Sequence, residues 1–499
     1  MYVLNAQQMR NADAMASEKY GIPGMVLMEN AAGAVYDHVI QKDYSSIVIV
    51  CGGGNNGGDG FALARLLYTN GCQVRVFCFA DKTRIKGDAA LNLSILDKMD
   101  VKVETSLEEL TNALKQCQAV VDAIFGTGFR GEIQGSYKEA IDIINNSGKH
   151  VISIDIPSGI CSDTGKASNA YIKADCTITF CCKKPGLILE TGRQASGLVL
   201  VRGISMPEGC ILSQKPYITT NDESYPALLI KKRSMESHKG DYGRVYVVAG
   251  SYNMSGAVAL CAKAALRMGS GLVTCVVPES IMDRVGTIVP EATFLSLDEK
   301  ECDKYTYEEA LKQICNASDA VAFGPGMGTG KKAAEMLKAM LENYKGKLVI
   351  DADGINILSE YKELLKKLTP DIILTPHPGE MSRLTGLTVK EINTGRMDVA
   401  RRFAEERNCI LVLKGASTVV SDGRKLYINT SGNPGMATGG SGDVLTGIIA
   451  SLCGQGYEPW EASVLGCYLH GCAGDAAMEQ YGYGLTAGDL PDFIGRIKK

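Results

Sequence analysis

The segment NPGMATGGSGDVLTG, residues 433–447, is the chain's clearest candidate for chemistry, because its glycines lead directly into an apolar helical pattern. Unpaired N–H groups and the dipole at a helix N-terminus favour an anion, and glycine lets the backbone come close to it. The turn therefore predicts a phosphate site with the carboxylate of Asp443 beside the ligand. It lacks the Gly-Lys-Ser/Thr ending of a Walker A loop. Taken alone, GGSGD could equally be a helix cap whose aspartate complements the dipole.

A second candidate lies near the N-terminus, where the apolar run SIVIV (46–50) enters CGGGNNGGDGFALARLL (51–67). Its glycines satisfy a dinucleotide fingerprint only loosely. The side chains of Asn55, Asn56 and Asp59 are more distinctive, because a plain tight turn does not need three polar side chains. A purely structural turn is the simpler alternative here.

Two later apolar runs of the N-terminal half carry carboxylates close to their ends. Asp122 precedes GTGFRG, and Asp155 begins DIPSG. Carboxylates at the ends of parallel strands point toward the crevice where ligands bind. Asn56, Asp122 and Ser158 could together offer hard oxygen donors to a cation.

Two series of short apolar runs alternating with helical stretches must position these residues, which predicts two α/β units with parallel sheets buried on both faces. The runs of the first series are residues 46–50, 73–79, 119–125 and 151–156, with helices at 6–19, 25–40, 61–68 and 136–145. Those of the second are 244–249, 272–277, 320–323, 347–351, 372–375 and 410–414, with a hairpin at 418–429 and helices at 443–452 and 459–481. Proline, glycine and polar residues at 206–226 predict a linker.

The composition narrows the class of protein. Charged residues make up 22% and the net charge is −4, with no basic stripe, which argues against a nucleic-acid partner. The N-terminus does not read as a secretory signal, and no apolar run reaches the roughly 18 residues of a membrane helix. The 17 cysteines are scattered without a C-x-x-C pair, as expected of reduced thiols. We therefore expect a cytoplasmic protein without a membrane partner, and a homo-oligomer.

Four more loops of the C-terminal half follow predicted strands or lie next to them: GPGMG, DADG, TPHPGE and LKG. Together with NPGMATGGSGDVLTG they resemble the ADP-dependent NAD(P)H-hydrate dehydratases, which have the ribokinase-like fold. The resemblance covers about residues 226–499 and is most specific in the last motif. It implies that the ring hydroxyl of hydrated NADH or NADPH, in the S form, is removed as water while ADP is converted to AMP and phosphate.

The same resemblance implies the residues of this site. Those that contact the hydrate are Ala257, Gly326, His377 and Asp443. Those that hold the nucleotide, with Mg²⁺ accompanying ADP, are Lys414, Gly415, Ala416, Ser417, Thr418, Gly439, Gly440, Ser441 and Gly442.

Simpler interpretations exist for several polar residues of this half. His377 could cap a turn, and Lys414 could be a surface lysine. Asp351 and Asp353 could be turn residues or could hold Mg²⁺ through water.

Phosphorylation gives this dehydration a physical rationale, because hydroxide is a poor leaving group and phosphate a good one. In our hypothesis, Asp443 takes the hydroxyl proton as the oxygen attacks the terminal phosphoryl group of ADP. The N–H groups of residues 440–442 stabilise the charge on that phosphoryl group, and the ring nitrogen then expels phosphate.

The N-terminal motifs NNGGDG, VDAIFGTG and IDIPSG resemble the NAD(P)H-hydrate epimerases, a Rossmann-like family, over about residues 1–213. The resemblance implies interconversion of the R and S hydrates, with Asp155 as the acid/base residue. Its K⁺ ligands fall on Asn56, Asp122 and Ser158. Its substrate contacts fall on Asn55, Asn56, Gly57, Gly58, Asp59, Gly126, Thr127, Gly128, Phe129, Arg130, Gly131, Glu132 and Asp155.

We therefore expect an α/β protein with an N-terminal Rossmann-like three-layer domain (1–213), a linker (214–225) and a C-terminal ribokinase-like domain (226–499). Its substrates are hydrated NADH or NADPH and ADP. One alternative is a small-molecule kinase of the ribokinase-like fold, since fold alone does not choose the reaction. Another is that the N-terminal domain is a non-catalytic scaffold, like related domains of RNA-processing proteins.

Overall fold

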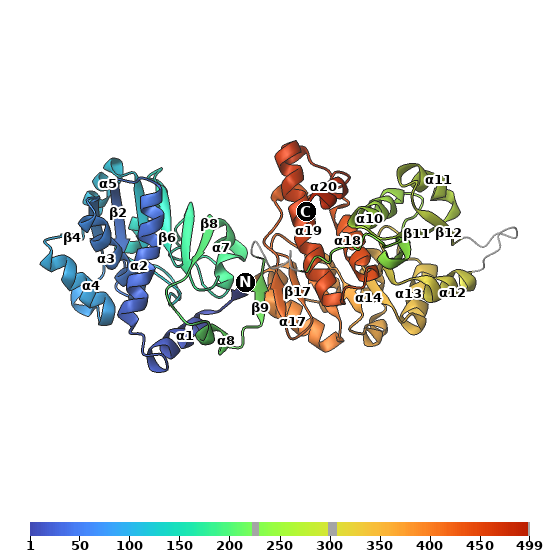
Figure 1. Cartoon of the computed structure of the whole chain (residues 1–499), viewed down its shortest axis with the longest axis horizontal. Helices are drawn as coiled ribbons and strands as arrows, with labels where there is room; N and C mark the ends of the chain where they lie inside the picture. The colour runs from blue at the N-terminus through green and yellow to red at the C-terminus, as the bar shows by residue number, and fades with distance from the viewer. Residues whose placement is uncertain (222–228, 298–306, 498–499) are drawn as a thin grey trace. The chain divides into compact units, whose positions relative to one another are not determined.

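The chain forms two compact units, Met1–Ile218 and Thr219–Lys499 (Figure 1). The computed structural model describes residues 1–221, 229–297 and 307–497. Within these ranges no helix is both long and apolar enough to cross a bilayer. The 16 cysteines in these ranges are all free.

The first unit is a seven-stranded parallel sheet in the order β4-β3-β2-β5-β6-β7-β8. Its strands are β2 (Ser46–Cys51), β3 (Gln73–Cys78), β4 (Val103–Glu104), β5 (Ala119–Ala123), β6 (His150–Ile154), β7 (Cys176–Phe180) and β8 (Leu198–Arg202). Its α-helices are α1 (Ala6–Glu18), α2 (Gly24–Gln41), α3 (Asn55–Thr69), α4 (Gly87–Lys98), α5 (Leu107–Gln116), α6 (Ser136–Asn145), α7 (Glu190–Ala195) and α8 (Glu208–Leu212). A short strand β1 (Tyr2–Val3) bridges Lys183.

Helices cover both faces of this sheet, which explains why its strands read as continuous apolar runs. Ile47 and Ile49 of β2 pack into one core with α2 and α3. Val48 and Val50 of the same strand face the other core, with α5 and α6.

Helix α3 begins at Asn55, six residues before the predicted helix, so NNGGDG is helical and its prediction as a loop is wrong. Close packing is the physical reason. A Cβ on Gly57 would lie 1.9 Å from the carbonyl oxygen of Gly52, and one on Gly60 would lie 2.6 Å from Cβ of Ala123. The contacts that glycine permits outweigh its helix-propensity penalty of about 1 kcal/mol.

The second unit carries a sheet in which β18-β17-β16-β15-β14-β13-β10-β11-β12 are neighbours in that order. Its strands are β10 (Arg244–Val248), β11 (Leu272–Val277), β12 (Thr293–Ser296), β13 (Ala320–Phe323), β14 (Lys347–Ile350), β15 (Ile372–Leu374), β16 (Ile410–Leu413), β17 (Val419–Ser421) and β18 (Leu426–Ile428). Strands β10 to β16 are parallel, whereas β17 and β18 form the predicted antiparallel hairpin.

One face of this sheet packs on α10 (Ser255–Met268), α18 (Ser441–Gly454), α19 (Pro459–Tyr481) and α20 (Leu490–Ile497), which share one apolar core with β10 to β16. The remaining helices are α11 (Glu279–Ile288), α12 (Tyr307–Ala317), α13 (Lys331–Asn343), α14 (Asp353–Glu360), α15 (Pro378–Thr385), α16 (Val389–Thr394) and α17 (Arg396–Arg407).

The boundary between the two units, after Ile218, falls inside the predicted linker at 206–226, part of which is structured. This segment contains helix α8 and strand β9 (Ile218–Thr220). The hydroxyl groups of Thr219 and Thr220 donate to the carbonyl oxygens of Leu426 (3.3 Å) and Ile428 (2.7 Å). Prolines tolerated beside short elements produced the linker-like composition. Residues 222–226 lie outside the described ranges.

The glycine contacts in α3 generate a stability prediction. Replacing Gly57 by alanine forces a methyl group against the Gly52 carbonyl, so Gly57→Ala should lower the free energy of unfolding of the first unit by about 1–3 kcal/mol. The matched control is Gly54→Ala, where no atom lies within 4 Å of the added Cβ. Urea unfolding of both variants tests this, and equal stabilities would contradict the packing argument.

Candidate active sites

A buried ion pair joins the carboxyl ends of two strands in the second unit. Asp351 follows β14 and Lys414 follows β16, and Nζ of Lys414 lies 2.7 Å from Oδ1 of Asp351. Thr446 of α18 donates to the other carboxylate oxygen at 2.7 Å. Lys414 is therefore an interior residue rather than a surface lysine. Asp351 therefore already neutralises a cation of the protein itself.

Glu380 and His377 line the same strand-end region at the start of α15. Nδ1 of His377 accepts the backbone N–H groups of Gly379 (3.0 Å) and Glu380 (3.3 Å), so His377 does cap the helix. Burial, together with the charge of Lys414, lowers the pKa of His377 and keeps the ring neutral. Its half-exposed ring still faces outward and can contact a ligand.

Glu380 is almost fully buried, and its carboxylate lies 3.9 Å from Nζ of Lys414. Burial raises the pKa of Glu380 to about 7, although the ammonium of Lys414 opposes that rise. The motif TPHPGE contains this residue, but no local pattern indicates that it lies beside Lys414.

Asp443 lies in the first turn of α18, next to the predicted anion site. The backbone N–H groups of Gly442 and Asp443 donate to no described residue, as expected at a helix N-terminus. Gly440 has φ of +92°, and a Cβ there would meet Leu260 at 2.4 Å. Burial and the nearby charge of Asp351 raise the pKa of Asp443 to about 7. The N-terminus thus combines anion-binding amides with a carboxyl group poised to exchange a proton near neutral pH.

Lys414 lies beside the glycine turn at the N-terminus of α18. A Cβ on Gly442 would lie 3.2 Å from Nζ of Lys414. The carboxylates of Asp351, Glu380 and Asp443 raise the pKa of Lys414 against the effect of burial, so the ammonium stays charged. An anion bound at the turn therefore meets both N–H groups and a positive charge.

Two predicted substrate contacts lie next to each other at the ends of β10 and β13. A Cβ on Gly326, whose φ is +62°, would lie 3.0 Å from Cβ of Ala257. The N–H group of Gly250 donates to the carbonyl oxygen of Pro325 at 2.8 Å and so ties the two strand-end loops together. The structure thus brings Ala257 and Gly326 together.

Two residues that sequence analysis did not identify contact the loop after β16 and the start of α18. Arg396 of α17 is buried, and its guanidinium donates to the carbonyl oxygens of Leu413 (2.9 Å) and Lys414 (2.8 Å), at the start of the predicted nucleotide loop 414–418. His470 of α19 lies 3.3 Å from Oγ of Ser441, and burial lowers its pKa to about 4. Both act over long sequence separations, which leave no local pattern.

In the first unit, Asp122 and Ser158 form one fully buried cluster. Oδ1 of Asp122 accepts the hydroxyl group of Ser158, and Oδ2 accepts the N–H group of Ser158 (2.9 Å) and the hydroxyl group of Ser153 (2.8 Å). Ser158 Oγ also accepts the N–H group of Phe125 at 2.8 Å. The predicted cation ligands therefore meet at the ends of β5 and β6.

Asn56 lies beside Gly126, the residue after the Phe125 whose N–H group donates to Ser158. A Cβ on Gly126 would lie 3.4 Å from its side-chain oxygen. Asn56 is buried, yet neither its side-chain oxygen nor its nitrogen has a hydrogen-bond partner among the described residues. A buried amide without partners costs free energy and points to a missing ligand.

Asp155 follows β6 and sits in the left-handed region, with φ of +66°. Its Oδ1 accepts the ammonium of Lys184 at 2.6 Å. Asp59 of α3 lies near this pair, and burial, with added repulsion from Asp155, raises the pKa of Asp59 well above its ordinary range. Lys184 was missed because the strand before it, β7, was not predicted.

Other predicted contacts of this half are packed or paired. Gly57 and Gly58 are buried, and a Cβ on Gly58 would meet Met28. Arg130 pairs with Asp163 at 2.7 Å. Phe129 stacks on Phe125 with ring centroids 5.0 Å apart.

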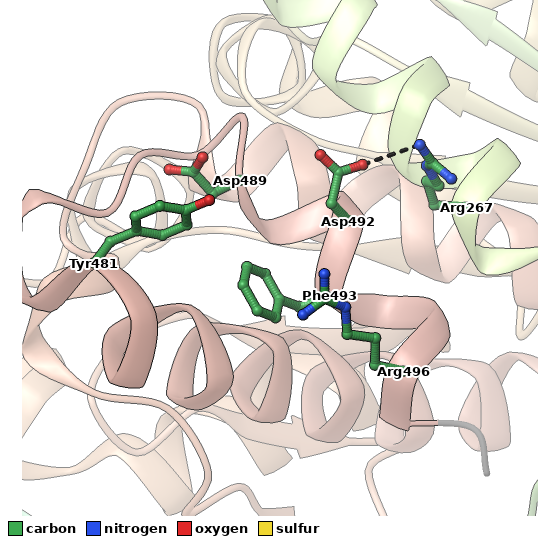
Figure 2. Close-up of a pocket in the computed structure, with 6 residues that line it drawn as sticks. All are labelled: Arg267, Tyr481, Asp489, Asp492, Phe493 and Arg496. Carbon is green, nitrogen blue, oxygen red and sulfur yellow. Dashed lines mark ion pairs between the residues drawn. The ribbon is translucent and has the colours of Figure 1, made fainter.

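A shallow surface hollow of about 370 Å³ contains none of the predicted site residues. Its lining comes from the ends of α10 and α19 and from α20, and Figure 2 shows Arg267 paired there with Asp492, at 3.1 Å. The paired charges leave it without a strong preference for an ion.

Comparison with known proteins supports two functional domains. The family model described as NAD(P)H-hydrate dehydratase matches residues 245–496, and that described as YjeF-related protein N-terminus matches residues 24–186. The protein called bifunctional NAD(P)H-hydrate repair enzyme Nnr from Moorella thermoacetica is 40% identical over 510 aligned residues, which cover 99% of this chain and 96% of that protein. The chain belongs to the bifunctional NAD(P)H-hydrate repair enzymes.

A second repair enzyme of the same name, from Thermofilum pendens, is 38% identical over 505 residues, covering 99% of this chain and 95% of that protein. A ribokinase-like superfamily protein from Enterococcus faecalis has a similar structure, with a TM-score of 0.51 and 25% identity, covering 56% of this chain and 95% of that one. The predicted fold class and the predicted pairing of an epimerase domain with a dehydratase domain are confirmed.

The raised pKa of Asp443 predicts how stability varies with pH. Because its pKa is about 7 in the folded repair enzyme against 3.8 ordinarily, the folded state binds the proton more tightly, so its contribution to stability is lost as pH rises from about 4 to about 7. Asp443→Asn should therefore stabilise the second unit at pH 8 and lose that advantage at pH 4. Thermal unfolding at both pH values tests this, with the exposed Asp398→Asn as control. A pH-independent difference would contradict the burial argument.

Proposed function

We propose that the second unit of this repair enzyme dehydrates the S hydrate of NADH or NADPH with ADP, and that Asp443 is the general base. The observation that carries this is the position of Asp443, beside the free N–H groups at the start of α18 and with a pKa of about 7. A base works best when its pKa lies near the working pH.

In this mechanism Asp443 accepts the proton of the ring hydroxyl as that oxygen bonds to the β-phosphorus of ADP. The bond from that phosphorus to the bridging oxygen breaks, and AMP leaves. The lone pair of the ring nitrogen then forms a C=N bond and expels phosphate, and loss of a ring proton restores the reduced nicotinamide. The free N–H groups of Gly442 and Asp443 can stabilise the charge on the transferring phosphoryl group.

Lys414 supplies positive charge to the same phosphoryl group, since its ammonium lies next to Gly442. Asp351 and Thr446 fix its position. The loop 414–418 and the turn 439–442 would hold the rest of the nucleotide, while Ala257, Gly326 and His377 contact the hydrate.

We propose that Mg²⁺ arrives with the diphosphate of ADP rather than in a carboxylate site of the protein. Asp351 is already paired with the ammonium of Lys414, and the oxygens of Asp353 accept hydrogen bonds from Gly328 N (2.8 Å) and Asn356 Nδ2 (3.2 Å). No cluster of three metal-binding side chains occurs among residues 1–221, 229–297 and 307–497.

Asp443→Asn should abolish dehydration while leaving nucleotide binding largely intact, because the N–H groups and Lys414 remain. The loss in kcat should be about 10²–10⁴-fold, measured as regained absorbance at 340 nm from the S hydrate and ADP. The wild-type rate should fall as pH decreases through about 7, where Asp443 becomes protonated.

Full turnover by Asp443→Asn would eliminate this role. Accumulation of a stable phosphorylated product by the wild type, without regained absorbance, would instead support the small-molecule kinase.

For the first unit we propose that K⁺ binds between Asn56, Asp122 and Ser158. The buried and unpartnered side chain of Asn56 supports this, since its oxygen lacks a donor and a cation would satisfy it. Bound K⁺ would fix the end of β5 and the loop 126–132 against the substrate. The epimerase chemistry then falls to Asp155, with Asp59 and Asn55 among the substrate contacts.

Replacing K⁺ by tetramethylammonium, at constant ionic strength, should slow epimerisation and lower the unfolding temperature of the first unit. Asn56→Leu should remove the K⁺-dependent stabilisation, because it deletes the buried oxygen. Differential scanning calorimetry with KCl or tetramethylammonium chloride measures this, with the exposed Asn55→Leu as control. An unchanged K⁺ response in Asn56→Leu would refute the site.

A further inference from the structure

Lys184 is a lysine whose ammonium has no capacity left for a ligand. Its side chain is 1% exposed. Nζ donates to Oδ1 of Asp155 (2.6 Å), Oγ1 of Thr179 (2.8 Å) and the carbonyl oxygen of Phe180 (3.2 Å). Since an ammonium has three donors, all are used. Burying such a charge is costly unless it is compensated, so its effect must pass through these partners.

The topology brings Lys184 and Asp155 together. Asp155 follows β6 and Lys184 follows β7, and these strands are parallel neighbours. The N–H group of Asp155 donates to the carbonyl oxygen of Ile178 at 2.8 Å, which extends the ladder, and Thr179 Oγ1 donates to Oδ1 of Asp155 at 3.2 Å. Together they lock a carboxylate whose backbone has an unusual positive φ of +66°.

The hydrogen bonds that the Asp155 side chain accepts from Lys184 and Thr179 both go to Oδ1. Oδ2 receives no hydrogen bond from any residue that the structure describes, and the side chain is partly exposed. Oδ1 is thus tied to the protein while Oδ2 stays available.

Two further carboxyl groups interact electrostatically with this pair. Burial raises the pKa of Asp13, on α1, to about 6, with Lys184 opposing and Asp155 adding to the rise. Asp59, on α3, has a still more strongly raised pKa. The titratable cluster therefore contains one ion pair and two carboxyl groups with raised pKa values.

We infer that Lys184 is a positioning residue of the epimerase reaction: it fixes Oδ1 of Asp155 and leaves Oδ2 free for the substrate. This rests on the proposed role of Asp155. It assigns a role to a lysine that the sequence motifs did not include.

The proton balance follows from this assignment. The ring hydroxyl takes a proton from solvent, the C–O bond breaks, and water leaves as the lone pair of the ring nitrogen forms a C=N bond. Water then adds to the opposite face of the ring and gives its proton to Oδ2 of Asp155. Oδ2 returns that proton to solvent, and the reverse reaction passes through the same steps in the opposite order.

A double-mutant cycle with Lys184→Met and Asp155→Asn tests the inference in the full chain. Without ADP the dehydratase is idle, so conversion of R to S hydrate can be followed by chromatography. We expect each single variant to lower kcat by about 10²-fold or more, with KM changed less than about threefold. The double variant should be no slower than Asp155→Asn, because Lys184 acts only through Asp155.

Controls separate positioning from folding. Dehydration of the S hydrate with ADP by the same samples reports the second unit, and urea unfolding reports the first. Lys173→Met, at an exposed lysine, should leave epimerisation unchanged. If Lys184→Met does not fold, Thr179→Val replaces it, with an expected loss of about threefold or more in kcat alone, since it removes one contact to each partner.

Three outcomes decide the matter. A folded Lys184→Met variant with near wild-type kcat would overturn the positioning role, as would a double variant much slower than Asp155→Asn. An Asp155→Asn variant that remains active would instead overturn the proposed role of Asp155 itself.

Discussion

A lysine placed between the ends of parallel strands requires a carboxylate to neutralise it, and this requirement shapes the dehydratase site. The ammonium of Lys414 is held by Asp351, and Asp351 also accepts the hydroxyl group of Thr446 in α18. One carboxylate thus fixes both the positive charge and the helix whose N-terminus faces the anion. Removing it would leave a buried ammonium without its closest partner, which is far more costly than losing a surface pair.

The same charges raise the pKa of neighbouring carboxyl groups. Asp443 and Glu380 both have pKa values near 7, caused first by burial, with Asp351 adding to the rise and Lys414 opposing it. Carboxyl groups that are held out of water reduce stability at alkaline pH, but only such groups can exchange protons near neutrality. Burial of Asp443 and Glu380 therefore lowers stability at alkaline pH and allows proton transfer near neutral pH.

The first unit also pairs a buried lysine with an aspartate at the end of a parallel strand. Its buried Lys184 contacts Asp155 at the ends of β6 and β7, while Asp122 is held by hydroxyl and N–H groups at the end of β5. Membership of the repair family places an epimerase domain and a dehydratase domain in the same chain.

The sequence by itself determined the α/β class, the two strand series and the glycine segments, because apolar periodicity and glycine placement are local signals. It also determined the family, through motifs such as NPGMATGGSGDVLTG. It could not show that NNGGDG is helical, since that depends on the contact of Gly57 with Gly52. Nor could it find Lys184, Arg396 or His470, whose partners lie on other elements. Those assignments required the tertiary structure, because burial and charge pairing arise only when distant strand ends are brought together.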